Sequence, residues 1–151
     1  MLAWFGILNE RPNTQAVMEY PYIPNQPDAS VGGGISNKGK IKSEVPQNAT
    51  LYSALVKCYP LHVLLDVLGV RTVHYFSLDV EGLELKILKT LPFGRIPFHV
   101  IQVEPMWNDE GKEPLKEFIL SLGYNLVDKT NTDFIFANMT ALQKMGRMKE
   151  K

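Results

Sequence analysis

The segment from Tyr75 to Phe93 constrains the fold of this chain more than any other part of the sequence. An apolar run from Val73 to Leu78 ends abruptly in the acidic turn Asp79-Val80-Glu81-Gly82. A helical pattern follows at once, with apolar side chains at Leu83, Leu85, Ile87, Leu88 and Leu91. This order predicts a buried parallel strand, a tight acidic turn and a helix. Because ligands of open α/β sheets bind at the carboxyl ends of such strands, the acidic turn is the first candidate site.

Strands and helices alternate along the chain after the first third of the sequence. Strands are predicted at Leu55–Tyr59, Val73–Asp79, Phe98–Glu104, Tyr124–Asp128 and Asp133–Ala137. Helices are predicted at Leu61–Leu68, Gly82–Thr90, Pro114–Leu122 and Met139–Lys151. Such alternation implies an α/β fold with a parallel sheet and right-handed crossovers. The last two strands flank a turn and predict a hairpin that adds an antiparallel strand.

The N-terminal third of the chain has a different composition. Residues 9–50 contain five prolines, which break long elements, and Ser30–Gly39 is a loop by composition. A Gly-rich loop holds phosphate only between a strand and a helix N-terminus, and neither flanks this one. The chain is therefore divided into an irregular segment, 1–50, an α/β part, 51–138, and a basic tail, 139–151.

Charge and cysteine usage exclude several classes of protein. The chain has 16 basic and 16 acidic residues, so no basic field predicts a nucleic-acid partner. Cys58 is the only cysteine, cannot form an internal disulfide, and is interpreted as a small buried hydrophobe. No apolar run approaches the roughly 18 residues of a membrane span. The apolar start, Leu2–Leu8, lacks the preceding basic residues of a signal peptide and is interpreted as the remnant of a strand or helix.

Three carboxylates follow the predicted strands at the edge where a ligand would bind. Asp79 and Glu81 lie on the acidic turn, and Glu104 ends the next strand. Neighbouring strand ends lie about 5 Å apart, so Glu104 is expected to converge with Asp79. One carboxylate would act as a general base toward a hydroxyl, or two would bind a hard divalent ion. Alternatively, the turn acids satisfy free N–H groups of the helix, and Glu104 is a solvated strand end. The residues alone leave both interpretations open.

The remaining reactive side chains predict no site. His74 and His99 each lie in an apolar strand and His62 lies on a helix, and all three are interpreted as satisfied or edge histidines. No second His or Cys stands at metal-ligand spacing, so no zinc site is predicted. Ser77 lacks the Gly-x-Ser-x-Gly turn of a hydrolase nucleophile. Trp107 is interpreted as core or rim packing rather than as part of an acceptor pocket.

The same residues carry a family resemblance. The segment YFSLDVEGLELKILKTLPF resembles the central motif of FkbM-type methyltransferase domains, which reads like (I/L)D-x-EG-x-E-x-x-(V/I)L. The later segments HVIQVEP, FILSLGYNLV and DFIFAN fall where that family has its next strand, helix and final strands. The resemblance covers Val56–Asn138. It implies part of a methyltransferase-like, Rossmann-type doubly wound sheet that is mostly parallel, with a terminal antiparallel hairpin strand.

The resemblance implies S-adenosylmethionine as the cofactor and a small-molecule or sugar hydroxyl as the methyl acceptor. It favours the functional interpretation of Asp79, Glu81 and Glu104 as catalytic residues, with Asp79 also beside the cofactor. The cofactor site of this fold needs a Gly-rich turn after one strand and an acidic residue after the next. No such turn is found, and Glu10, after Leu2–Leu8, is the candidate acid for the ribose. We therefore expect the C-terminal part of such a domain, either a fragment or a degenerate copy.

Within the family, the wording YFSLDVEG looks most like an animal branch that includes Star-type proteins. That likeness implies a non-catalytic factor that helps membrane-bound growth-factor precursors leave the endoplasmic reticulum for the Golgi. The sequence thus leaves open a cytoplasmic methyltransferase and an endoplasmic reticulum or Golgi trafficking factor. A third alternative is an inactive copy whose unpaired edge strand favours aggregation.

Overall fold

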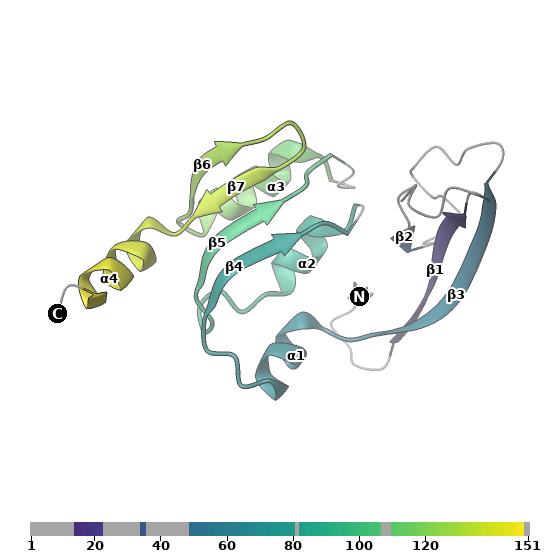
Figure 1. Ribbon diagram of the computed structural model, residues 1–151, viewed down its shortest axis with the longest axis horizontal. Coiled ribbons are helices and arrows are strands. Elements are labelled where there is room, and N and C mark those ends of the chain that lie inside the picture. Colours follow the sequence, from purple (N-terminus) through teal and green to yellow (C-terminus); the bar gives the residue numbers. More distant parts are fainter. Residues whose placement is uncertain (1–13, 23–33, 36–48, 81, 107–109, 150–151) are drawn as a thin grey trace. The chain divides into compact units, whose positions relative to one another are not determined.

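The computed structural model describes residues 14–22, 34–35, 49–80, 82–106 and 110–149 (Figure 1). The chain divides into two compact units, Met1–Val63 and Leu64–Lys151. Helix α1 (Leu61–Val67) contains the division between them. No helix within the described ranges combines the length and the apolar character needed to cross a bilayer.

The described part of the first unit is a three-stranded antiparallel sheet in the order β2-β1-β3. Its strands are β1 (Thr14–Tyr22), β2 (Gly34–Ile35) and β3 (Thr50–Cys58). The prediction of an irregular segment is therefore wrong for β1 and β2, and β3 begins earlier than predicted. Pro21 does not break β1 because it lies near the strand end, beyond the residues that pair with β2, where a missing N–H donor is tolerated.

The second unit contains a mixed four-stranded sheet in the order β4-β5-β7-β6. Its strands are β4 (Val73–Leu78), β5 (Phe98–Val103), β6 (Asn125–Lys129) and β7 (Phe134–Ala137). Strands β4 and β5 are parallel, whereas β7 runs antiparallel to both β5 and β6. The predicted α/β class and the antiparallel hairpin strand are confirmed. The described sheet is mixed rather than mostly parallel, because β7 contributes two antiparallel pairings.

Helices α2 (Glu84–Thr90) and α3 (Lys112–Ser121) lie on the same face of this sheet (Figure 1). Their buried positions follow the helical period, and β5 and β7 present buried apolar side chains as well. The fully buried part of this core includes Leu85, Leu88, Ile101, Val103, Leu115, Ile119 and Phe136. Burying each such side chain stabilises the fold by roughly 1.5–3 kcal/mol, which fixes the sheet that carries the candidate sites.

Helix α4 (Met139–Lys149) follows β7 and begins with a polar cap. The Oδ1 atom of Asn138 accepts a hydrogen bond from the amide of Ala141 at 3.0 Å. This bond satisfies one of the free N–H groups of the first turn. The amide of Asn138 itself donates to the carbonyl of His99 at 2.8 Å, so the start of α4 is attached to β5.

Candidate functional site

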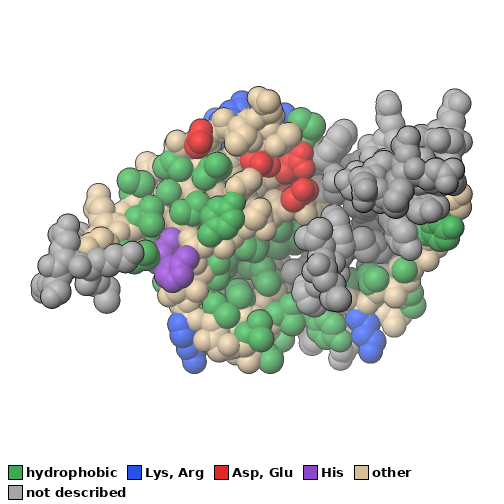
Figure 2. Space-filling model, in the orientation of Figure 1, with side chains coloured by type: hydrophobic (Ala, Val, Ile, Leu, Met, Phe, Trp, Pro, Cys, Tyr) green, Lys and Arg blue, Asp and Glu red, His purple; other side chains and the backbone are tan. Residues whose placement is uncertain are grey.

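The acidic turn lies at the carboxyl edge of the parallel strand pair. The register pairs Leu78 with Val103, so Asp79 and Glu104 follow side by side, and the amide of Glu104 donates to the carbonyl of Leu78 at 3.2 Å. Asp79 is exposed and Glu104 is half-buried. Figure 2 shows acidic side chains gathered at the end of the sheet toward which the β4 and β5 arrows of Figure 1 point. The structure thus brings together the two strand ends that the sequence predicted to meet.

Glu84 is a residue of this turn for which the sequence predicted no role. Glu84 is 1% exposed although its side chain is charged. Its Oε1 atom accepts hydrogen bonds from the amides of Val80 at 3.1 Å and Gly82 at 3.0 Å, and Oε2 accepts from Gly82 at 3.1 Å. A buried carboxylate is tolerated because backbone donors replace its water. The available signal was an acid in the first helical turn, two residues after a glycine.

These bonds decide part of the question that the sequence left open. Satisfying the turn amides was the alternative role for the acids at this edge, and the bonds to Val80 and Gly82 are made by Glu84. The exposed carboxylate of Asp79 is therefore not the group that bonds these two amides. Glu81 and Glu10 lie outside the described residues, so their predicted roles stay predictions.

Cys58, Ser77 and Trp107 were each assigned no catalytic role from the sequence. Cys58 is 1% exposed, which confirms its interpretation as a buried hydrophobe. Ser77 is exposed on β4, and Trp107 lies outside the described residues. Within the described part of the chain, no three His, Cys, Asp or Glu side chains form a group that could hold a metal ion.

His74 and His99 form a pair that was not predicted. Each is the second residue of its strand, and the register that pairs Val73 with Phe98 and Tyr75 with Val100 places them side by side. Their Nδ1 atoms lie 3.0 Å apart and their ring centroids 4.9 Å apart. At this distance one Nδ1 donates and the other accepts, so the two rings differ in tautomer or charge. The sequence does place each histidine second in its predicted strand. This predicts that the two rings meet only if the strands are known to pair in register.

The imidazoles of His74 and His99 lie in different electrostatic surroundings. Burial lowers the pKa of the His99 imidazole below its ordinary value, and the nearby His74 ring lowers the pKa further. His99 is 7% exposed, whereas His74 is exposed. The neutral form of His99 is therefore favoured, because its positive charge would be both desolvated and close to a second imidazole.

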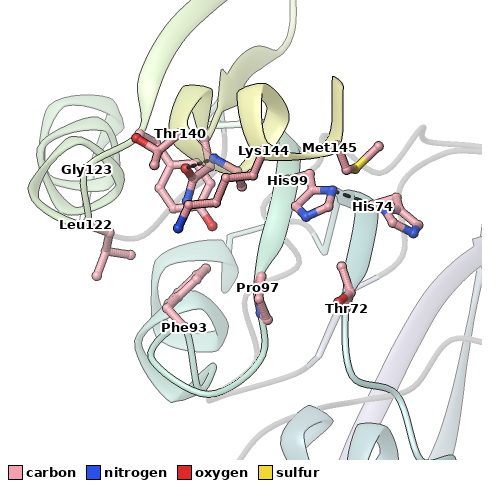
Figure 3. A pocket seen from close by; sticks show the side chains of 13 residues that line it. Thr72, His74, Phe93, Pro97, His99, Leu122, Gly123, Thr140, Lys144 and Met145 are labelled. Carbon is pink, nitrogen blue, oxygen red and sulfur yellow. Dashed lines mark hydrogen bonds between the residues drawn. The ribbon is translucent and has the colours of Figure 1, made fainter. Parts of the chain in front are cut away.

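The histidine pair borders a pocket of about 680 Å³ at the amino ends of β4 and β5. Its walls come from the starts of these strands, the turns after α2 and α3, and the first half of α4. Figure 3 shows the two imidazoles turned toward one another, with Lys144 extending from α4 along the pocket. The pocket and the acidic turn thus lie at opposite ends of the same two strands.

Tyr124 fixes one wall of this pocket. Its hydroxyl donates to the carbonyl of Phe98 at 2.7 Å, and burial raises the pKa of its phenol above the ordinary value. The ring of Phe93 lies 5.2 Å from that of Phe98 and 6.1 Å from that of Tyr124. These contacts hold the wall in place without a ligand, since aromatic pairs at such distances attract one another.

The fold and these two sites define an α/β protein with a mixed sheet, an acidic turn at one end of its parallel pair and a histidine pocket at the other. Comparisons of the chain with family models, curated proteins and solved structures find no match.

Proposed function

We propose that the α/β part of the chain, which carries the resemblance over Val56–Asn138, is the C-terminal part of an FkbM-type, Rossmann-type methyltransferase-like domain that methylates a hydroxyl group of a small molecule or sugar. The methyl donor would be S-adenosylmethionine. The observation that carries this proposal is the exposed carboxylate of Asp79, which follows β4 beside Glu104 at the carboxyl edge of the parallel pair. Ligands of α/β sheets bind at this edge.

The topology supports the same proposal. The motif that resembles the FkbM family occupies β4, the acidic turn and α2, as a strand–turn–helix unit. Strand β5 then pairs in parallel with β4, and β7 inserts antiparallel between β5 and β6. A terminal hairpin that adds an antiparallel strand is what the resemblance implies for the end of the domain.

The residues of the acidic turn have distinct proposed roles. Asp79 would accept the proton of the acceptor hydroxyl as the methyl group is transferred, because it is exposed where an acceptor can approach. Glu84 would act as a positioning residue, since its bonds to Val80 and Gly82 hold the backbone of the turn. Glu104 would be the second carboxylate at this edge. Alignment of donor and acceptor would supply most of the acceleration.

The described residues do not by themselves form the donor site. Strand β4 is the edge of the described sheet, and no described strand pairs with its free side. The strands of the first unit form an antiparallel sheet of their own instead of strands parallel to β4. Glu81, and Glu10 as the acid for the ribose, are proposed contributors that lie outside the described residues.

Calorimetric titration with S-adenosylhomocysteine tests the proposal on the whole 151-residue chain. Saturable binding is expected, and Asp79→Asn is expected to lower methyl transfer by roughly 10²- to 10⁴-fold without changing the melting temperature. Glu117→Gln, an exposed substitution on α3, is the matched control and is expected to leave methyl transfer and the melting temperature unchanged. A cooperatively folded chain that does not bind S-adenosylhomocysteine would contradict the enzymatic proposal.

One observation favours a second, non-catalytic function. In the antiparallel sheet of the first unit, the paired residues Val17 and Leu55 share one face and are 39% and 64% exposed. Exposed apolar side chains on a sheet suit contact with another protein. This favours a Star-type role in endoplasmic reticulum-to-Golgi export, with a membrane-bound growth-factor precursor as the partner. Co-precipitation of such a precursor, lost in Val17→Ser with Leu55→Ser and kept in Asp79→Asn, would separate this role from catalysis.

A further inference from the structure

We propose that the pocket beside His74 and His99 binds a small organic carboxylate with a compact apolar body. The pocket lies at the amino ends of β4 and β5, whereas the proposed methyl-transfer edge lies at their carboxyl ends. The proposed ligand is therefore neither the methyl donor nor the methyl acceptor, and the inference does not depend on the proposed function.

The charge of the lining selects an anion. The ionisable side chains around the pocket are His74 from β4, His99 from β5, Lys144 from α4 and the phenol of Tyr124. None of the described residues that line it is acidic. A chain with equal numbers of acidic and basic residues thus presents a locally basic pocket. A carboxylate placed there would be attracted by Lys144 and by a proton on the histidine pair.

The histidine pair makes binding of an anion dependent on protons. With the Nδ1 atoms 3.0 Å apart, one proton fits between the rings, and a second would place two N–H groups against one another. A bound carboxylate would offset the repulsion and raise the affinity of the pair for protons. Binding therefore takes up protons, and affinity rises as the pH falls.

The apolar part of the lining selects the rest of the ligand. Phe93, Pro97, Leu122 and Met145 contribute apolar walls to the pocket. A volume of about 680 Å³ falls in the range of small-molecule sites and exceeds what a carboxylate alone would fill. A dianion such as phosphate is disfavoured by these walls, because removing two charges from water costs more than removing one.

Three probes separate the parts of this proposal in an NMR titration of the whole chain. Benzoate carries both the carboxylate and an apolar ring. Acetate carries the carboxylate alone, and benzyl alcohol carries the ring without a negative charge. Saturable shifts with benzoate are expected at residues that line the pocket, and roughly tenfold weaker binding is expected for the other two probes. Benzoate affinity is expected to be higher at about pH 6 than at about pH 8, where its own charge is unchanged.

Variants with exposed changes test the residues. His74→Gln and Lys144→Gln are each expected to weaken benzoate binding several-fold, and His74→Gln also removes most of its pH dependence. Lys112→Gln, on α3 and outside the pocket, is the matched control and binds as the unaltered chain does. The proposal is overturned by a folded chain that does not bind benzoate, by equal binding of benzyl alcohol or acetate, or by both pocket variants binding like the control.

Discussion

The buried carboxylate of Glu84 accepts hydrogen bonds from the amide of Gly82, two residues earlier, at 3.0 Å and 3.1 Å. A third bond, from the amide of Val80, completes the closure of the turn that follows β4. Backbone donors in a buried turn lose free energy when no acceptor replaces water. The side chain of Glu84 therefore fixes the backbone of the turn that directly follows Asp79.

Removing this carboxylate is expected to destabilise the second unit. Glu84→Ala should lower the free energy of unfolding by about 1–3 kcal/mol, because two turn amides lose their acceptor. Glu84→Gln should cost less, since it keeps one carbonyl oxygen at the same place. Urea denaturation followed by circular dichroism measures both changes. Glu117→Ala, on the exposed side of α3, is the control and should stay within about 0.5 kcal/mol. Equal midpoints for Glu84→Ala and the control would contradict the assigned role.

The backbone of the same turn predicts a second effect. Gly82 has a φ of 115°, in the region that side chains with a Cβ rarely adopt. Gly82→Ala is therefore expected to lower the unfolding free energy by about 1–3 kcal/mol through strain alone. Gly94→Ala is the matched comparison, because Gly94 has no positive φ and a Cβ there would meet no atom within 4 Å. The prediction is wrong if thermal melts of the two variants coincide.

Periodicity was sufficient to predict the elements of the second unit. The apolar run before Asp79 and the helical spacing of Leu85 and Leu88 predicted β4 and α2 within two residues of their observed bounds. Local patterns succeed here because these elements bury one regular face. Strand β1 was missed because the proline rule ignores where in a sheet the proline falls, and Pro21 stands beyond the residues that pair with β2.

The candidate sites were less predictable, since they depend on contacts between distant residues. Asp79 and Glu104 could be placed together because both stand at the carboxyl ends of predicted parallel strands. His74 and His99 could not, because their pairing depends on a register that a one-residue slip would destroy. The burial of Glu84 depends on its hydrogen bonds with the amides of the turn. The spacing of apolar residues does not predict such bonds.

The pocket wall gives a third prediction, from two tyrosines in different surroundings. The hydroxyl of Tyr124 bonds the carbonyl of buried Phe98, whereas the hydroxyl of exposed Tyr75 bonds Gln102 near solvent. Tyr124→Phe should lower the unfolding free energy by about 1–2 kcal/mol, because water does not replace the lost donor. Tyr75→Phe should change it by less than about 0.5 kcal/mol. Chemical denaturation of both variants checks the difference, and an equal loss from each would contradict the burial argument.

The histidine pair gives the last prediction, which concerns pH. The pKa of His99 is lowered by burial and then by His74, so NMR titration should place it below the ordinary value of about 6.5. His74→Ala should raise this pKa only partly, because burial remains. As pH falls below about 6.5, the unfolded chain takes up a proton at His99 before the folded chain does. Stability is thus fully present above that pH and is lost as the pH falls toward the folded pKa. The His99→Asn variant should lose this component of the pH dependence. A His99 pKa above that of the unfolded chain would reverse the slope and contradict the assignment.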